Sequence, residues 1–290
     1  MDHHAVTPLP PTEPAPPQGN ARSRHLRRLM VRAFAAARRG HLGSALSMTE
    51  ILQRLYDDFL RHRPGEPLWP DRDRCILSKG HGCLGLYAIL ADKGYFPLAD
   101  LDGFSRFDSP LGGHPERHRI PGVEASTGAL GHGLGIGLGM ALAARLQKRA
   151  SRVVVILGDG EINEGSVWEA ALAAGKHRLD NLLAIVDYNR FQSYGAVTSV
   201  LPLEPLVDKW RAFGFATREV DGHDLNAIGD ALEAFPFAGG KPSLILAHTI
   251  KGKGVPFLEN DPAWHHQSRV ADAVIDRMVA LLADPPQAGG

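Results

Sequence analysis

Two short, uninterrupted apolar runs, Val153–Leu157 and Leu182–Val186, stand out in the hydrophobic pattern of the chain. Runs of Val, Ile and Leu of this length are typical of strands buried on both faces of a parallel sheet. Between them, Val167–Lys176 has the alanine-rich composition of a helix. The pattern predicts a strand–helix–strand unit. Because such crossovers are right-handed, both strands would end side by side at one edge of a sheet.

The same alternation of apolar runs and helical segments continues along the chain. A buried strand that enters a helix is predicted within residues 71–82, and further strands at Ala216–Val220 and Ser243–Ala247. Helices are predicted at Leu206–Phe213 and Leu225–Phe235. Repeated alternation of this kind predicts an α/β fold, with three α/β/α layers around a mostly parallel sheet.

Helical spacing of apolar residues is also present near the N-terminus. It runs from Leu26 to Ala37 and ends at Arg38-Arg39-Gly40, a typical C-terminal signal. A second helix is predicted over Met48–Leu60, with Ser47 as its N-cap.

A glycine-rich segment, Ser126–Leu146, is predicted to be a helix that packs closely through its small residues. Its glycines are not a dinucleotide-binding fingerprint, because no clear strand precedes them. A membrane-spanning helix is excluded as well, since Arg145 and Lys148 follow too soon.

Composition narrows the class of protein. The formal net charge is +0, so the chain lacks the basic surface that binds nucleic acid or anionic membranes. Cys75 and Cys83 follow neither a zinc spacing nor a disulfide framework, which favours a cytoplasmic protein. Residues 1–20 contain six prolines and are predicted to be a disordered tail, whereas residues 21–285 form the folded domain.

Polar residues follow both strands of the central unit. Asp159 comes directly after the first strand and Asn189 follows the second. Because both strands would end at the same edge, a carboxylate and an amide oxygen meet there, and these oxygens suit a hard cation such as Mg²⁺. Gly158 and Gly160 would let a ligand with its own oxygens, such as a diphosphate, come close to the backbone.

These residues carry a resemblance to a known family. The stretches GDGEINEGSVWEA and VDYNRFQSYG resemble the thiamine-diphosphate signature of transketolases, and over residues 21–285 the chain is similar to the N-terminal subunit of a split transketolase. The resemblance implies the thiamine-diphosphate-binding fold, thiamine diphosphate and Mg²⁺ as cofactors, and transfer of a two-carbon ketol group from a ketose to an aldose. Small sugars would be the substrates.

The resemblance also implies roles for particular residues. Histidines would orient substrate hydroxyls and move protons, and Glu164 would join a carboxylate network with Glu169 across a subunit interface. The residues implied in catalysis are His41, His81, His114, His265 and Glu164; those implied in cofactor binding are His81, Gly128, Ala129, Leu130, Asp159, Gly160, Glu164, Asn189 and His265; and the metal ligands are Asp159, Asn189 and the main-chain carbonyl of Phe191.

Some positions depart from the family pattern, namely Leu42, His132, Tyr188 and His266. Of the adjacent histidines His265 and His266, the pattern selects His265 as the one that faces the site. Lys79 is expected to be exposed to solvent.

Complete transketolases continue with a pyrimidine-binding domain that supplies the glutamate that activates the cofactor. We therefore expect this chain to be inactive alone and to need a separately encoded pyrimidine-binding and C-terminal subunit, as a heterotetramer. Alternatives remain open. The chain could belong to another thiamine enzyme, such as the alpha subunit of a 2-oxo acid dehydrogenase, to a specialised pair that acts on an unusual ketose, or to a non-catalytic scaffold.

Overall fold

The computed structural model describes residues 20–284, so apart from Asn20 the predicted tail, residues 1–20, lies outside the described residues. The centre is a five-stranded sheet in the order β1-β2-β3-β7-β6, with every neighbouring pair parallel. Its strands are β1 (Arg74–Leu77), β2 (Val153–Gly158), β3 (Leu182–Tyr188), β6 (Ala216–Asp221) and β7 (Ser243–His248).

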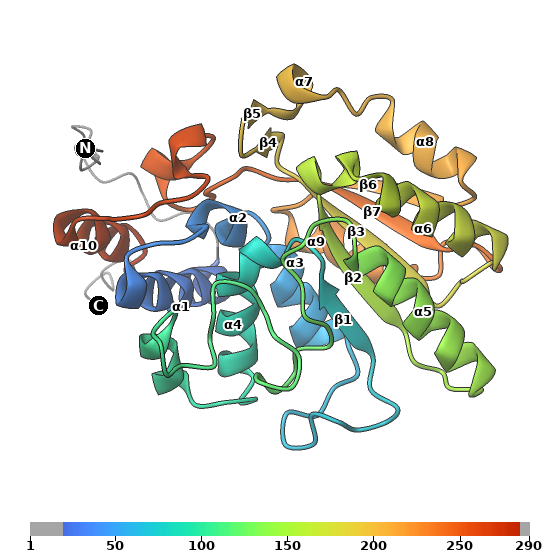
Figure 1. The fold of residues 1–290 in the computed structure, drawn as a ribbon, viewed down its shortest axis with the longest axis horizontal. Coiled ribbons are helices and arrows are strands. Elements are labelled where there is room, and N and C mark those ends of the chain that lie inside the picture. Colours follow the sequence, from blue (N-terminus) through green and yellow to red (C-terminus); the bar gives the residue numbers. More distant parts are fainter. Residues whose placement is uncertain (1–19, 285–290) are drawn as a thin grey trace, which may run out of the picture.

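Helices cover both faces of this sheet. In Figure 1, α5 and α6 lie side by side in front of it. The helices are α1 (Ala21–Ala37), α2 (Leu42–Leu46), α3 (Thr49–Arg54), α4 (Cys83–Asp92), α5 (Gly133–Leu146), α6 (Gly165–Lys176), α7 (Val197–Val200), α8 (Leu206–Ala212), α9 (Leu225–Glu233) and α10 (Asp272–Leu281). A small hairpin of β4 (Phe191–Gln192) and β5 (Gly195–Ala196) follows β3.

Alternate residues of each strand point into separate hydrophobic cores. Val154 and Ile156 of β2 pack into the core formed with α1, α3, α4 and α9. Val155 and Leu157 pack into the other core, formed with α5, α6 and α8. Because every residue of β2 and β3 is buried, the strands carry continuous apolar runs, as strands between two helical layers must.

The predicted three-layer α/β fold and its parallel sheet are confirmed. The strand–helix–strand unit corresponds to β2, α6 and β3, and the predicted strands near the C-terminus correspond to β6 and β7. The hairpin and α10 were not anticipated. No described helix has the length and apolar character needed to cross a membrane.

Two local predictions are wrong. The glycine-rich helix begins at Gly133 instead of Ser126, because Gly128 and Gly131 have positive φ angles of 139° and 83°, which an α-helix excludes. Ser47 is not an N-cap; its hydroxyl donates to the carbonyl of Ser44 at 3.1 Å and to Asp187 at 2.6 Å.

Candidate functional site

A polar cavity of about 280 Å³ lies at the carboxyl edge of the sheet, where β2 and β3 end. The structure brings most of the expected site residues to its wall: His41, His81, His114, His265, Gly128, Leu130, Asp159, Gly160, Asn189 and Phe191. Carboxyl edges of parallel sheets are the usual ligand-binding positions of α/β folds. Ala129 and Glu164 do not line this cavity; both are exposed.

Asp159 is buried at the edge of this cavity, with 1% of its surface exposed. One oxygen accepts a hydrogen bond from the backbone of Gly160 at 2.8 Å, and the other accepts from the backbone of Arg190. Burial raises the pKa of Asp159 to about 7, and the nearby charge of Asp187 raises it as well, against those two hydrogen bonds. An unpaired carboxylate held in this way would be stabilised by a bound cation.

Asn189 follows β3 and is also buried. Its amide nitrogen donates to Asp187 at 3.1 Å and its oxygen accepts from the backbone of Phe191 at 3.1 Å. An amide oxygen has two lone pairs, so one remains for a cation. Among residues 20–284, no group of three or more His, Cys, Asp or Glu side chains could hold a metal ion. A cation here would therefore also need oxygens from amides, the backbone or a ligand.

Histidines from four separate segments surround the mouth of the cavity. The ring of His41 lies 5.3 Å from that of His81, 6.4 Å from His114 and 5.5 Å from His265, measured between ring centroids. The ring of His266 is 4.6 Å from His41, but His266 lines an adjoining cavity of about 290 Å³. His265 lines the main cavity, as the family pattern suggested.

Burial keeps these histidines neutral. It lowers the pKa of His41 to about 3 and that of His265 to about 4, and the charge of Lys251 contributes in the same direction to both. Burial likewise lowers the pKa of His81 and of His114. A neutral imidazole has one hydrogen-bond donor and one acceptor. These four histidines can therefore donate hydrogen bonds to the hydroxyls of a sugar or accept hydrogen bonds from them.

Lys251, which the sequence pattern did not predict as a site residue, lies behind the cavity wall against His265. It is 1% exposed, and its ammonium lies 2.6 Å from Nδ1 of His265. Burial lowers the pKa of Lys251 to about 8, with a further contribution from the charge of Lys79. Within the described part of the chain, no carboxylate lies within ion-pair distance of Lys251. Its ammonium is therefore buried without a counter-charge, which a bound anion would supply. The GKG context suggested only a loop.

Lys79 corrects an expectation. It was expected to be exposed, but it is fully buried and forms an ion pair with the fully buried Asp187. Its ammonium also donates to the carbonyl of Ser44 at 3.0 Å. Burial alone would raise the pKa of Asp187, but Lys79, Ser47 and Thr249 hold it below its ordinary value. A lysine beside glycine and serine gave no sign of a carboxylate 108 positions later in the chain.

Two glycines of the cavity wall lie close against neighbouring side chains. A Cβ at Gly160 would lie 2.7 Å from Cβ of Gln192, and a Cβ at Gly128 would lie 2.8 Å from the ring of His114, so both positions need glycine. The amide nitrogen of Gln192, which also lines the cavity, is buried without a hydrogen-bond partner in the described structure. The free donor of Gln192 fits a diphosphate, which needs hydrogen-bond donors.

Glu161 is a second residue that the sequence pattern did not predict. It is 2% exposed and accepts hydrogen bonds from the backbones of Gly131 at 2.9 Å and Gly158 at 3.1 Å, and from the hydroxyl of Ser78. It therefore joins the ends of β1 and β2 to the loop before α5. Glu164 and Glu169, which the family pattern emphasised, are both exposed.

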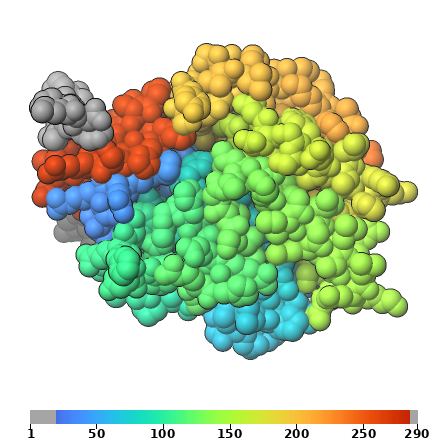
Figure 2. Space-filling model, in the orientation of Figure 1, coloured from blue at the N-terminus to red at the C-terminus, as the bar shows by residue number. Residues whose placement is uncertain are grey.

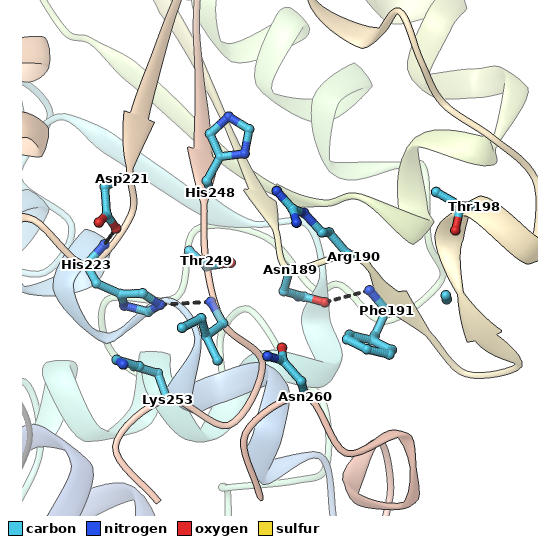
Figure 3. A pocket seen from close by; sticks show the side chains of 12 residues that line it. Asn189, Arg190, Phe191, Thr198, Asp221, His223, His248, Thr249, Lys253 and Asn260 are labelled. Atoms are coloured by element: carbon cyan, nitrogen blue, oxygen red, sulfur yellow. Dashed lines mark hydrogen bonds between the residues drawn. The ribbon is translucent and has the colours of Figure 1, made fainter. Parts of the chain in front are cut away.

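A larger cavity of about 750 Å³ adjoins the first and shares Asn189 and Phe191 with it (Figure 3). Three of its basic residues already have carboxylate partners: His223 contacts Glu50 at 3.0 Å, His248 contacts Glu219 at 3.0 Å and Lys253 lies 3.7 Å from Glu259. The smaller cavity, with the carboxylate of Asp159 and the four histidines in its wall, is the better candidate for the chemistry.

Along most of its length the chain is similar to known transketolases. A family described as transketolase, thiamine diphosphate binding domain, matches residues 20–287. A 6-deoxy-6-sulfo-D-fructose transketolase subunit from Clostridium sp. is 45% identical, with 83% of this chain and 88% of the relative covered. One of the subunits of an apulose-4-phosphate transketolase from Actinobacillus succinogenes is 44% identical, over 81% of this chain and 85% of the relative.

Solved structures agree with this result. A transketolase variant from Pichia stipitis superposes with a TM-score of 0.85 at 31% identity, over 92% of this chain. A transketolase from Leishmania mexicana gives the same TM-score over 93%. The chain spans only 41% and 42% of these two proteins.

Proposed function

The chain belongs to the transketolase family of thiamine-diphosphate-binding domains, and we propose that it is the diphosphate- and metal-binding half of a two-chain transketolase that acts on an unusual ketose. Residues 21–285 would form this domain. The observation that carries the proposal is the cavity at the sheet edge: its wall contains Asp159, a buried carboxylate without an ion pair, and His265, whose ring contacts the buried ammonium of Lys251.

Each charged group has a natural partner in the cofactor. Asp159, Asn189 and the main-chain carbonyl of Phe191 would hold Mg²⁺, because they offer the hard oxygen ligands that this ion prefers. Lys251, His81 and His265 would hold the diphosphate, whose charge offsets the cost of burying Lys251. Gly160 and the free amide of Gln192 would lie beside the diphosphate, whereas Gly128, Ala129 and Leu130 would contact the rest of the cofactor.

Bound there, thiamine diphosphate would supply the electron sink for cleavage of the carbon–carbon bond next to a ketose carbonyl. The protein's part is to orient the substrate and handle protons. His41, His81, His114 and His265 are neutral and lie around one point, so they can donate to a carbonyl oxygen and accept from a hydroxyl.

The partner subunit would dock on the surface formed by α5 and α6, which lie side by side in the green and yellow-green region of Figure 2. Exposed apolar and small residues gather on these helices, including Ile136 and Leu172, which are 37% and 59% exposed. Glu164 and Glu169 are exposed at the same surface, where they could form the carboxylate network with a partner. We propose a heterotetramer in the cytoplasm; both cysteines are free thiols.

The substrate would be a ketose with an anionic end group. The relatives named above act on a sulfonated and on a phosphorylated ketose. In this chain His266 adds a further histidine next to His41, with 4.6 Å between the ring centroids. Pyruvate decarboxylation by the assembled complex would instead support the 2-oxo acid dehydrogenase alternative.

The metal assignment is tested with Asp159→Ala. We expect this variant to lose the increase in Tm that thiamine diphosphate plus Mg²⁺ gives the assembled complex, because the cation loses its only carboxylate. Asp208→Ala, which removes an exposed carboxylate of α8, is the matched control and should keep the full increase. Normal stabilisation of Asp159→Ala would contradict the assignment.

The catalytic role is tested with His114→Ala in the co-expressed complex. We expect assembly to be retained, because His114 is exposed in this chain, and ketol transfer to fall by about 10²-fold or more. Full activity of this variant would contradict the catalytic role of His114. Full activity of the single chain would contradict the need for a partner subunit.

A further inference from the structure

Four arginines lie close together at the amino end of the sheet, far from the cofactor cavity in the topology of the strands. Arg74 is the first residue of β1 and is in register with Val153, the first residue of β2. The cofactor cavity is at the opposite ends of these strands. We propose that this arginine cluster, Arg72, Arg74, Arg117 and Arg149, is a second ligand site that binds the phosphate group of a small metabolite.

The cluster lines a cavity of about 270 Å³, whose wall includes the C-terminal half of α5. A second cavity of about 250 Å³ adjoins it and shares Arg72, Arg117 and Glu124. Part of its wall comes from the loop before β1, drawn in light blue at the bottom of Figure 1. Its lining is partly apolar, with contributions from Pro67, Leu68, Ile120, Pro121 and Val123. The phosphate would lie in the first cavity and the rest of the metabolite in the second.

The charges of the cluster are not balanced within the described residues. Arg72 uses both oxygens of Glu124, at 2.6 and 2.8 Å, and Arg149 pairs with Asp71 at 2.5 Å. Arg74 lies 3.7 Å from Glu124 and donates to the backbone carbonyls of Arg72 at 3.3 Å and Pro70 at 3.2 Å. Arg117 has no side-chain hydrogen bond or ion pair in the part of the chain that the structure describes. The four arginines therefore share two carboxylates, Glu124 and Asp71, and Arg117 has neither.

The nearest other carboxylate is already committed. Asp73 is buried and binds Arg61 at 2.9 Å and Arg152 at 2.7 Å, so it does not neutralise the cluster. Burial lowers the pKa of Arg74, and the charges of Arg72, Arg149 and Arg117 lower it further against the attraction of Glu124. Like charges at this spacing repel each other, and a bound dianion would reverse the sign of that interaction.

An independent observation points to a ligand in the same cavity. Ser151 lines it and is only 4% exposed, yet its hydroxyl has no hydrogen-bond partner in the described structure. A buried hydroxyl without a partner is costly, whereas a hydroxyl can donate to a phosphate oxygen. Guanidinium groups bind phosphate oxygens with paired, charge-assisted hydrogen bonds. The combination of Arg74, Arg117 and Ser151 suits a phosphate group.

The site does not depend on the proposed cofactor chemistry. It shares no lining residue with the cofactor cavity, and its ligand would lie at the amino ends of β1 and β2. A phosphate there cannot reach the histidines, so the bound metabolite is an effector and not the substrate. It would stabilise the loops on either side of the cluster.

Calorimetric titration of the purified full chain, at constant ionic strength set with chloride, tests the proposal. The probes are inorganic phosphate and glucose 6-phosphate. Arg117→Glu should weaken binding of either probe by about tenfold or more, and Ser151→Ala by about threefold. Lys241→Glu, a charge reversal of an exposed residue between α9 and β7, should leave the Kd unchanged. Arg117→Gln serves if the charge reversal disturbs folding.

Lys251→Met separates this site from the cofactor cavity, which also attracts anions. If phosphate binding survives Lys251→Met and is weakened by Arg117→Glu, the arginine cluster is the site. Tighter binding of glucose 6-phosphate than of phosphate identifies a phosphorylated metabolite, and equal affinity identifies free phosphate. If binding is lost in Lys251→Met and unchanged in Arg117→Glu, or if neither probe binds, the proposal is wrong.

Discussion

Two buried lysines at the carboxyl edge of the sheet have opposite surroundings. Lys79 is fully buried and is paired with Asp187, which also binds Ser47, Asn189 and Thr249. Lys251 is 1% exposed and has no ion pair in the described structure; its ammonium contacts the imidazole of His265, which lines the cofactor cavity. The first lysine completes a closed network that the fold needs. The second is a charge without a counter-charge, which marks a place where a ligand completes the structure.

Removal of Lys79 should have the largest effect on stability. Lys79→Met would leave Asp187 as an uncompensated buried carboxylate, so we expect the free energy of unfolding to fall by about 3–5 kcal/mol. Urea denaturation of the isolated chain measures this change. Lys253→Met, which removes a partly exposed lysine 3.7 Å from Glu259, should cost less than about 1 kcal/mol.

The double variant Lys79→Met/Asp187→Asn keeps this test informative if the single variant does not fold. The oxygen of the neutral amide can still accept from Ser47 and its NH2 group can donate to the hydroxyl of Thr249, so the double variant should regain much of the lost stability. Equal stability of Lys79→Met and the wild type would mean that the ion pair is not needed for the fold, and the contrast between the two lysines would disappear.

Lys251→Met should affect cofactor affinity much more than stability, whereas Lys79→Met should mainly affect stability. The free energy of unfolding should stay within about 1 kcal/mol of the wild type or rise, because the substitution removes an unpaired buried charge. Affinity for thiamine diphosphate should fall by about tenfold to a hundredfold, since a charge-assisted contact to the diphosphate is lost. Calorimetry on the complex with the partner subunit measures the affinity. A large loss of stability with unchanged affinity would assign Lys251 a structural role.

The smallest expected effect is a change in the affinity for thiamine diphosphate with pH. The ordinary pKa of a lysine lies well above 8, and burial lowers that of Lys251 to about 8. The ammonium is charged below this value and loses its proton above it, so its attraction to the diphosphate declines as the pH rises. We expect affinity for thiamine diphosphate to fall threefold to tenfold between about pH 7 and pH 9. Lys251→Arg stays charged and should show a flat profile; a decline of equal size in this variant would rule out Lys251 as its source.

Much of the fold could be predicted from the sequence, because it depends on local pattern. Continuous apolar runs at Val153–Leu157 and Leu182–Val186 can only be stable when both faces are covered, which is the condition for a three-layer parallel sheet. The positions of Asp159 and Asn189 followed from the strand ends, since a crossover brings them to one edge. The family resemblance supplied the histidines, and the structure places the four expected ones around the same cavity.

Tertiary structure alone decided which charged residues are buried and what they contact. Lys79 and Asp187 lie 108 positions apart, and Arg72 and Glu124 lie 52 apart, so no local spacing links them. Lys79 and Lys251 both stand beside glycine in the sequence, yet one is paired and the other is not. Apolar periodicity is a property of a few neighbouring residues. The pairing of a buried charge depends on which distant segment packs against it, and that is settled only when the chain has folded.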